Sequence, residues 1–320
     1  MRYLVTGASG YVGSQFVQHV LSAVPGAEVV AVVRDAAKAR RVLPDAAELV
    51  VIPDLAQPGA LDGVQGPVDY VVHCAAVTQS RVMVSHPVET ADSIVLTTRN
   101  VLDFARQRGV RAMVYVSSME ACGALDCSGH LAAEDELGVV DLYRARSSYP
   151  MGKRMAEQYC FDFFAEYGVP VRVARLAQTF GRGVPRDDGR VFAQFARAAM
   201  QGAPIVLHTA GRSMGNYCAI SDVVRALQLL LLRGKAGEVY HVVHEETTMT
   251  IRQMADLVAR EVSGGRSKVV VDIPEGMDFG YAADTGLRLS GAKLRALGWT
   301  PTQGLKEMYQ EMIADWEAGV

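Results

Sequence analysis

The strand–turn–helix pattern at the start of this chain constrains its fold more than any other segment. An apolar run over residues 2–6 leads directly into Gly7-Ala8-Ser9-Gly10-Tyr11-Val12-Gly13, and apolar residues at helical spacing follow. In such a unit the first glycine permits a tight turn, the second lets a pyrophosphate approach the backbone, and the third lets the helix pack on the strand. The helix N-terminus adds free N–H groups and a positive dipole end. The segment therefore predicts a dinucleotide site, with cofactor contacts from Gly7, Ser9, Gly10, Tyr11, Val12 and Gly13.

Composition indicates a large core and no strongly charged partner. Half of the 320 residues are hydrophobic, and the net charge of -3 supplies no basic field for nucleic acid. The five cysteines form no Cys-x-x-Cys pair and no metal-ligand pattern, and their odd number favours a reducing compartment. No apolar run reaches the length of a membrane span, and the early first strand leaves no room for a signal peptide. We therefore expect a cytoplasmic protein that acts on a small molecule, without a metal, nucleic-acid or membrane partner.

Short β-branched runs alternate with helical patterns through the first half of the chain. Runs typical of strands covered on both faces occur at 29–33, 49–52, 70–73, 113–117 and 170–176. Apolar residues at helical spacing cover residues 93–108 and 148–167. The alternation predicts an α/β fold with a Rossmann-type doubly wound parallel sheet, which we assign to residues 1–176 as an NAD(P)-binding domain.

The second half of the chain has a different character. Glycine, proline and charged residues become more frequent after residue 181, and helical patterns are expected at 192–201, 222–232, 251–262 and 305–316. No segment is rich enough in linker residues to separate an independent domain. We expect residues 177–320 to form mainly a smaller C-terminal substrate lobe, from which some segments return to the first domain.

Tyr149 and Lys153 lie four residues apart at the start of a predicted helix, on one face. A nearby ammonium favours the phenolate form of a tyrosine, and an oxidised nicotinamide would add to that positive field. The tyrosine could then act as an acid or base near neutral pH. Taken alone, this spacing is typical of an exposed helix pair. Its place after the fifth predicted strand, in a chain that begins with the glycine turn, favours a catalytic pair.

Ser117 and Ser118 end the fifth predicted strand, and Glu120 follows in the same loop. Strand ends in a doubly wound sheet face the ligand crevice, so a serine here could orient a substrate. The alternative is a serine that only caps a helix or a turn. For Glu120, a catalytic role and a solvated one both remain open.

The end of the second predicted strand bears on the cofactor's phosphate state. Val33 occupies the place where an acidic residue would accept from the adenosine ribose, and Arg34 follows. Arg34 could pair with a 2′-phosphate. Alternatively, Arg34 stacks on adenine while Asp35 reaches the ribose. NAD and NADP therefore both remain open as the cofactor.

Several segments together carry a family resemblance. TGASGYVG, HCAA at 73–76, SSMEACG at 117–123, YPMGK at 149–153 and LGWTP at 297–301 resemble the extended short-chain dehydrogenase/reductase family. This is the branch of NAD(P)-dependent nucleotide-sugar epimerases, dehydratases and decarboxylases. Locally, RSSYPMGKRMAEQYC and VRVARLAQTFGRGVPRDDGRV are most similar to UDP-glucuronate decarboxylase-type members. The resemblance spans nearly the whole chain.

The resemblance implies a role for each matching residue. Ser118 would hold a sugar hydroxyl, Tyr149 would be the base that starts 4-oxidation, and Lys153 would bind the nicotinamide ribose. Glu120 matches a glutamate that decarboxylases and 4,6-dehydratases carry and simple 4-epimerases generally lack. Further cofactor contacts are implied at Arg34, Asp54, Leu55, Ala75 and Ala76. Substrate contacts are implied at Ser118, Met119, Gln178, Arg190 and Arg212. A homodimer through the Tyr149 helix and the helix before the fifth strand is also implied.

The chain departs from the family pattern at three positions. Cys122 stands where the family usually has tyrosine, and Gln178 stands where it has asparagine. Gly215 stands where an arginine normally grips the nucleotide diphosphate. Because burying an unpaired anion is costly, another cation would have to serve. The nearest candidate is Arg212, and the further candidates are Arg182, Arg186 and Arg190.

We expect an NAD(P)-dependent enzyme that modifies a nucleotide sugar through a 4-keto intermediate. The ketone acidifies C5, so epimerisation, dehydration and loss of a C6 carboxylate all become accessible, and Glu120 favours the last two. Met119 replaces an aspartate of glucose-type 4,6-dehydratases and cannot donate a proton. In such a reaction Glu120 would therefore have to act as both the acid and the base. One alternative is a net NADP-dependent reductase or dehydrogenase acting on a non-nucleotide carbonyl or alcohol, which Arg34 and Gly215 favour. A second alternative is a non-catalytic cofactor-binding protein, which the intact catalytic residues disfavour.

Overall fold

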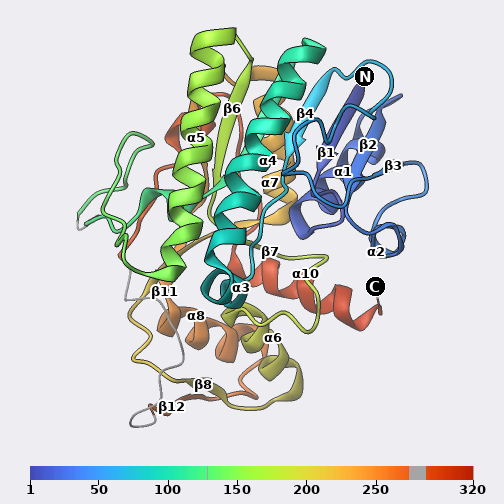
Figure 1. Cartoon of the computed structure of the whole chain (residues 1–320). Coiled ribbons are helices and arrows are strands. Elements are labelled where there is room, and N and C mark those ends of the chain that lie inside the picture. Colours follow the sequence, from blue (N-terminus) through green and yellow to red (C-terminus); the bar gives the residue numbers. More distant parts are fainter. Residues whose placement is uncertain (128, 274–285, 320) are drawn as a thin grey trace.

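The computed structural model describes residues 1–127, 129–273 and 286–319. Within these residues, seven strands form one large sheet in the order β10-β6-β5-β4-β1-β2-β3, and every neighbouring pair is parallel (Figure 1). The predicted doubly wound sheet is therefore confirmed, and its six predicted strands match to within one residue at each end. The strands are β1 (Arg2–Thr6), β2 (Glu28–Val33), β3 (Glu48–Val51), β4 (Tyr70–His73), β5 (Ala112–Ser118), β6 (Val171–Leu176) and β10 (Val239–Val242).

Helices cover both faces of this sheet. The helices of one face are α1 (Tyr11–Ala23), α2 (Ala36–Val42) and α7 (Ile220–Arg233), and their apolar sides share one buried cluster with the sheet. On the other face α4 (Pro87–Arg108) and α5 (Ser148–Tyr167) pack side by side and bury a second cluster. Because strand residues alternate between these two clusters, the strands are apolar without a polar face.

Helix α4 begins at Pro87, six residues before its predicted start. Proline suits the first turn of a helix because it lacks an N–H that would find no partner there. The polar residues that follow carry no apolar periodicity, so the pattern showed only the later turns. The short helix α3 (Ser80–Ser85) precedes α4, and the 3₁₀ turns η1 (Met119–Cys122) and η2 (Ala145–Ser147) lie between β5 and α5.

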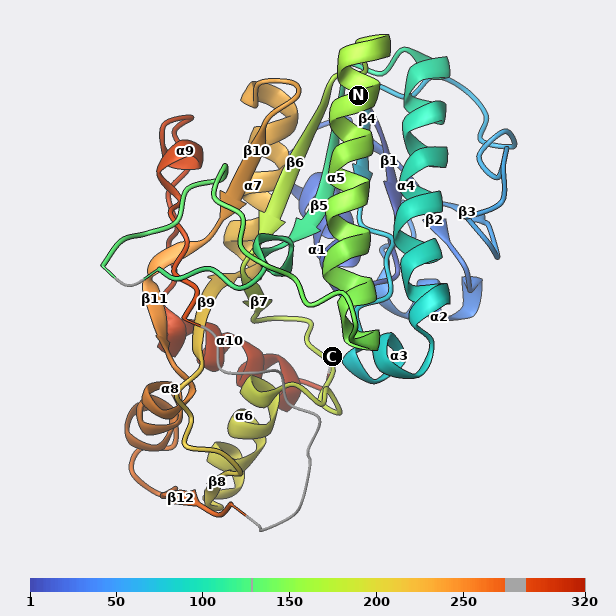
Figure 2. The ribbon, with the colours of Figure 1, turned by 60° about the vertical axis from the view of Figure 1, so that its left-hand side comes forward.

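The chain after β6 builds a smaller part below the large sheet (Figure 2). Its core joins Phe180 to Phe192, whose ring centroids lie 4.5 Å apart, and to Tyr309 at 5.0 Å. Its short strands have no alternating pattern, so the sequence did not predict them. The strands are β7 (Gln178–Phe180), β9 (Met214–Ala219), β11 (His244–Thr250), β8 (Ile205–Leu207) and β12 (Val269–Val271). The helices of this part are α6 (Val191–Gln201), α8 (Ile251–Leu257) with the π-turn η3 (Val258–Val262) and α10 (Leu305–Glu317), whereas the short helix α9 (Ala292–Arg295) lies beside β10.

Strand β10 and the helices α7 and α9 from the second half return to the large sheet. Strand β10 pairs with β6 at the edge, and α7 packs beside α1 (Figures 1 and 2). The described residues contain no helix with both the length and the apolar character that a membrane span requires.

Candidate active site

The glycine turn after β1 has the geometry that its three glycines predict. Gly7 has φ +65°, and a Cβ there would lie 2.7 Å from the backbone nitrogen of Ala75 after β4. A Cβ on Gly13 would overlap the carbonyl oxygen of Gly7, so only glycine lets α1 sit this closely on the turn. At Gly10, by contrast, a Cβ would meet a single atom within 4 Å among the described residues, the Gly7 oxygen at 3.1 Å. The space at Gly10 therefore suits a ligand that lies against the backbone.

The N-terminus of α1 is prepared for an anion. No side chain in the described part of the chain caps this helix, and the first intrahelical bond runs from the Ser14 nitrogen to the Gly10 oxygen at 2.9 Å. The N–H groups of Tyr11, Val12 and Gly13 thus have no partner within the helix. Ser9 lies half-buried in the turn beside them. This donor set and the helix dipole fit a dinucleotide pyrophosphate.

Helix α5 brings its tyrosine and lysine to the carboxyl end of β5. The Ser118 Oγ accepts from the Glu120 backbone nitrogen at 3.2 Å, and the Ser118 side chain lies close enough to the Tyr149 phenol to lower its pKa. Lys153 Nζ donates to the Val116 carbonyl oxygen at 2.8 Å, one turn of α5 below Tyr149. Ser118 therefore caps η1 and also faces Tyr149. The structure places Ser118, Tyr149 and Lys153 together.

Burial dominates the electrostatics of this group. Desolvation, with a smaller contribution from the Glu120 carboxylate, raises the pKa of Tyr149 to about 12 against the opposing effects of Ser118 and Arg146. Desolvation likewise lowers the pKa of Lys153 to about 8. The Lys153 ammonium lies 5.8 Å from the Tyr149 ring centroid and is held by Val116. Burial thus outweighs the lysine charge that we expected to lower the pKa of Tyr149.

Glu120 has a partner that the sequence did not assign to the site. Arg146 Nη2 lies 2.8 Å from each carboxylate oxygen of Glu120, and the guanidinium carbon lies 5.6 Å from the Tyr149 ring centroid. Arg146 belongs to η2, directly before α5. The Arg-x-x-Tyr spacing in the family-like segment was the one signal that could have identified it.

Two further residues of this family-like segment, Gly152 and Arg154, position α5 and the loop that follows Ser118. Gly152 lets α5 approach α4, because a Cβ there would already lie 3.3 Å from Ile94. Arg154 donates to the carbonyl oxygens of Ala121 at 2.7 Å and Gly138 at 2.6 Å. These contacts hold η1 and the following loop against α5.

A buried ion pair completes the support. Glu157 on α5 accepts from Arg175 Nη2 on β6 at 2.7 Å and from Ser117 Oγ on β5 at 2.5 Å. Both charged side chains are nearly inaccessible to solvent. Arg175 also donates to the Glu134 carbonyl oxygen at 2.8 Å and approaches Cys122 Sγ at 4.0 Å. The pair therefore ties α5, β5 and β6 together one residue from Ser118.

The residues expected around the cofactor's adenosine lie after the carboxyl ends of β2, β3 and β4. Arg34 is exposed, and its side chain has no hydrogen bond or ion pair among the described residues. Asp35 caps α2 by accepting from the Lys38 nitrogen at 3.0 Å, which lowers the pKa of its carboxyl. Asp54 likewise accepts within its own turn, from the Ala56 nitrogen at 2.9 Å and the Gln57 amide at 2.7 Å. Beside them, Leu55 is buried, and Ala75 and Ala76 are half-buried.

The expected substrate residues are more dispersed. Gln178 begins β7, half-buried, and Met119 packs at the edge of the core. Arg190 is held by Asp188 at 2.7 Å, with its guanidinium 4.7 Å from the Phe192 ring, whereas Arg212 is exposed.

Gly215 has a local reason to be glycine. A Cβ at this position would overlap the hydroxyl and ring of Tyr217, two residues along β9. The Tyr217 side chain is fully buried, and its hydroxyl has no hydrogen-bond partner among the described residues. Tyr217 therefore occupies the space that any side chain at 215 would need.

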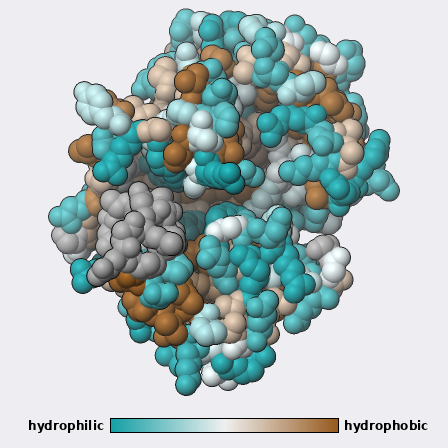
Figure 3. All heavy atoms as spheres, turned by 60° about the horizontal axis from the view of Figure 1, so that its bottom comes forward, coloured by the Kyte–Doolittle hydropathy of each residue, from teal (hydrophilic) through white to brown (hydrophobic). Residues whose placement is uncertain are grey.

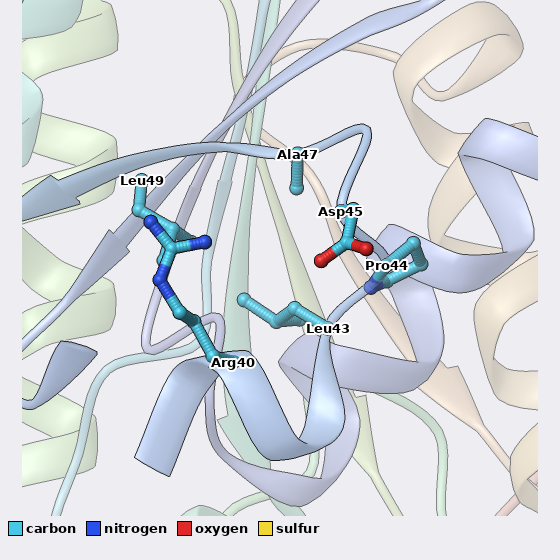
Figure 4. A pocket seen from close by; sticks show the side chains of 6 residues that line it. All are labelled: Arg40, Leu43, Pro44, Asp45, Ala47 and Leu49. Carbon is cyan, nitrogen blue, oxygen red and sulfur yellow. The ribbon is translucent and has the colours of Figure 1, made fainter. Parts of the chain in front are cut away.

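The surface is hollowed in one place, whereas the two small cavities lie away from the expected site residues. Figure 3 shows a hollow between two rounded parts of the molecule, with apolar side chains deep inside it. The cavity of about 10 Å³ in Figure 4 has room for about one water and is lined by residues of the α2–β3 segment, among them Arg40 and Asp45. A cavity of about 190 Å³ lies between residues 58–62 and α4. Neither cavity is lined by an expected site residue. Among the described residues, no three His, Cys, Asp or Glu side chains are placed to hold a metal ion.

The parallel sheet, the glycine turn and the Ser118–Tyr149–Lys153 group define a short-chain dehydrogenase/reductase of the extended type. A family model described as the NAD dependent epimerase/dehydratase family matches residues 3–243. The chain belongs to this family of NAD-dependent enzymes.

Relatives within the family catalyse several reactions. The chain is 28% identical to UDP-glucuronic acid decarboxylase 6 of Arabidopsis thaliana, over 99% of this chain and 89% of that protein. It is 27% identical to a dTDP-glucose 4,6-dehydratase of Streptomyces antibioticus, over 99% and 92%. The crystal structure of a Thermus thermophilus UDP-glucose 4-epimerase in complex with NAD has a TM-score of 0.83 and 26% identity, with both chains covered fully. The family resemblance inferred from the motifs is therefore confirmed.

Proposed function

We propose that this enzyme modifies a nucleotide sugar through a 4-keto intermediate, by dehydration, decarboxylation or epimerisation. The observation that carries the proposal is the group formed by Ser118, Tyr149 and Lys153 at the end of β5, with Glu120 in the same loop. The three relatives named above act on nucleotide sugars by their names, which supports this substrate class.

The residues divide the first step between them. A bound oxidised nicotinamide supplies the hydride acceptor and a positive charge. Ser118 and Tyr149 bind the hydroxyl of the sugar carbon that is oxidised, and the Tyr149 oxygen accepts its proton. Lys153 holds the nicotinamide ribose, and its charge favours the phenolate once the site is closed to water.

The second step falls to the loop that begins at Ser118. A 4-keto group acidifies the neighbouring C5 position, so a carboxylate in this loop can accept the C5 proton in a dehydration, in which the C6 hydroxyl leaves as water. In a decarboxylation the C6 carboxylate leaves as CO2 instead, and C5 then takes up a proton. Glu120 is the side chain we assign to these proton transfers, and its pairing with Arg146 orients it. A carboxylate here thus favours dehydration or decarboxylation over simple 4-epimerisation, which needs no proton transfer at C5.

The second half of the chain supplies the substrate contacts in this proposal. Gln178 begins β7 and is half-buried. Arg190 is already paired with Asp188, so the exposed Arg212 is the cation we assign to the diphosphate. We also propose a homodimer, located in the cytoplasm. Helices α4 and α5 lie side by side and expose apolar residues suited to such an interface, namely Val88, Leu96, Met151 and Met155.

Binding of nucleotide sugars tests the substrate class directly. In the presence of NAD or NADP, at least one UDP- or dTDP-sugar is expected to raise the melting temperature, since a ligand at 100 times its Kd stabilises the folded state by about 2.7 kcal/mol. The measurement is a thermal-shift screen, followed by product analysis of each ligand that binds. The free sugars serve as controls and should give no shift. Absence of a shift with every nucleotide sugar would exclude this substrate class.

One observation favours the second candidate, a net NADP-dependent reductase. Arg34 is exposed at the end of β2, while Asp35 is occupied as the cap of α2, which leaves the arginine to meet a 2′-phosphate. If so, Arg34→Ala should weaken NADP binding about 10–100-fold and leave NAD binding nearly unchanged, because a charge-assisted hydrogen bond contributes about 1.5–3 kcal/mol. Titration calorimetry with both cofactors measures this. Arg40→Ala, at the other end of α2, is the matched control. Equal effects on both cofactors would assign Arg34 to adenine stacking instead.

A further inference from the structure

Tyr149, the proposed base, lies near the Glu120 carboxylate, and this arrangement disfavours ionisation of the phenol. Tyr149 must lose a proton during the oxidation step, and a phenolate next to the Glu120 carboxylate would bring two negative charges together. Burial and Glu120 both raise the pKa of Tyr149. A positive group near both side chains is needed for the two to work in one site.

Arg146 is the group that the fold brings there. It lies 2.8 Å from both Glu120 oxygens and 5.6 Å from the Tyr149 ring centroid, three residues before Tyr149 and so on the same side of the chain. Its charge acts to lower the pKa of Tyr149. The other polar groups that face Tyr149 are Ser118 and Tyr115 on β5 and Lys153 on α5. The first two carry no positive charge, and the Lys153 ammonium is held by the Val116 carbonyl oxygen, so none of them pairs with Glu120.

We propose that Arg146 is a positioning residue of this active site, which pairs with Glu120 so that Tyr149 can ionise beside a carboxylate. The inference rests on the proposed roles of Tyr149 and Glu120. A guanidinium suits this position because a single nitrogen, Nη2, lies against both carboxylate oxygens while the planar group still lies over the Tyr149 ring.

Direct titration of the Tyr149 phenol tests the proposal without substrate. The protein saturated with oxidised cofactor is titrated by ultraviolet absorbance of the phenolate, and the spectrum of Tyr149→Phe is subtracted. Arg146→Gln is expected to move the Tyr149 transition to higher pH, and Glu120→Gln to lower pH. Each shift should be about 0.5–1 pH unit, because both side chains of the pair are about one-third exposed. In the double variant the two shifts should largely cancel.

Two further variants separate charge from architecture. Arg146→Lys keeps the positive charge, so its Tyr149 transition should lie closer in pH to that of the parent protein than the transition of Arg146→Gln does. If Arg146 had a purely structural role, the lysine would not bring the transition back. Arg144→Gln is the matched control, since Arg144 is an exposed neighbour that pairs with Asp141 at 2.8 Å, and it should not move the transition.

The outcomes distinguish this proposal from the proposed function. An unchanged transition in Arg146→Gln, or a double variant whose transition stays as high as that of Arg146→Gln alone, would overturn the role of Arg146. Because the titration uses no sugar, it remains decisive even if no nucleotide sugar binds. Full turnover by the Tyr149→Phe variant would instead overturn the proposed function.

Discussion

Replacing Tyr149 with phenylalanine is expected to lower turnover about 10²–10⁴-fold, the usual contribution of a general acid or base. The change removes only the phenol oxygen, whose pKa Ser118 and Glu120 influence. The ring stays in the buried cluster between α4, α5 and the sheet, so the melting temperature should remain nearly constant. Steady-state kinetics and thermal unfolding of the same preparation measure both quantities.

Tyr159→Phe is the matched control for this experiment. Tyr159 lies on the same helix, ten residues after Tyr149, half-buried, with its ring 6.5 Å from that of Phe163. Its loss should leave turnover unchanged. If Tyr149→Phe kept full activity, the acid–base role of Tyr149 would be wrong. If it lost activity and melted at a much lower temperature, the residue would serve the fold rather than the chemistry.

The second large effect is expected at the buried Glu157–Arg175 pair. Arg175→Met should lower the free energy of unfolding by about 3–5 kcal/mol, because it leaves the Glu157 carboxylate buried without its partner. Ser117 would then be the remaining side chain that donates to Glu157 in this network. Chemical denaturation of the variant and the parent protein measures the loss.

Two variants test whether an uncompensated charge is the cause. The double change Glu157→Leu with Arg175→Met removes both charges and should recover most of the lost stability, since apolar pairs can replace buried ion pairs at little cost. Arg172→Met is the control on the same strand. Arg172 donates to the backbone oxygens of Gly234 and Pro170, so its loss leaves no buried charge and should cost much less. Additive losses in the double variant would contradict the explanation.

Much of the fold could be predicted because short-range patterns of apolar residues indicate most of its strands and helices. A strand covered on both faces requires an apolar run, and the six runs of the first half all became strands of the large sheet. Helix α5 matched its predicted bounds because apolar residues recur at helical spacing along it. The short strands of the second half lack such patterns. They are held by tertiary pairing, as when β9 lies between β7 and β11.

The sequence by itself determined six of the seven strands of the large sheet, the glycine turn and the spacing that places Tyr149 and Lys153 on one helix face, because these depend on near neighbours in the chain. Only the tertiary structure decided which charged groups of the site are paired and in which direction the pKa of Tyr149 is shifted. It paired Glu120 with Arg146, 26 residues away, and buried Tyr149 so deeply that desolvation, not Lys153, sets the direction of its pKa shift. Desolvation and ion pairing depend on what surrounds a group in space, and that is known only once distant segments have packed together.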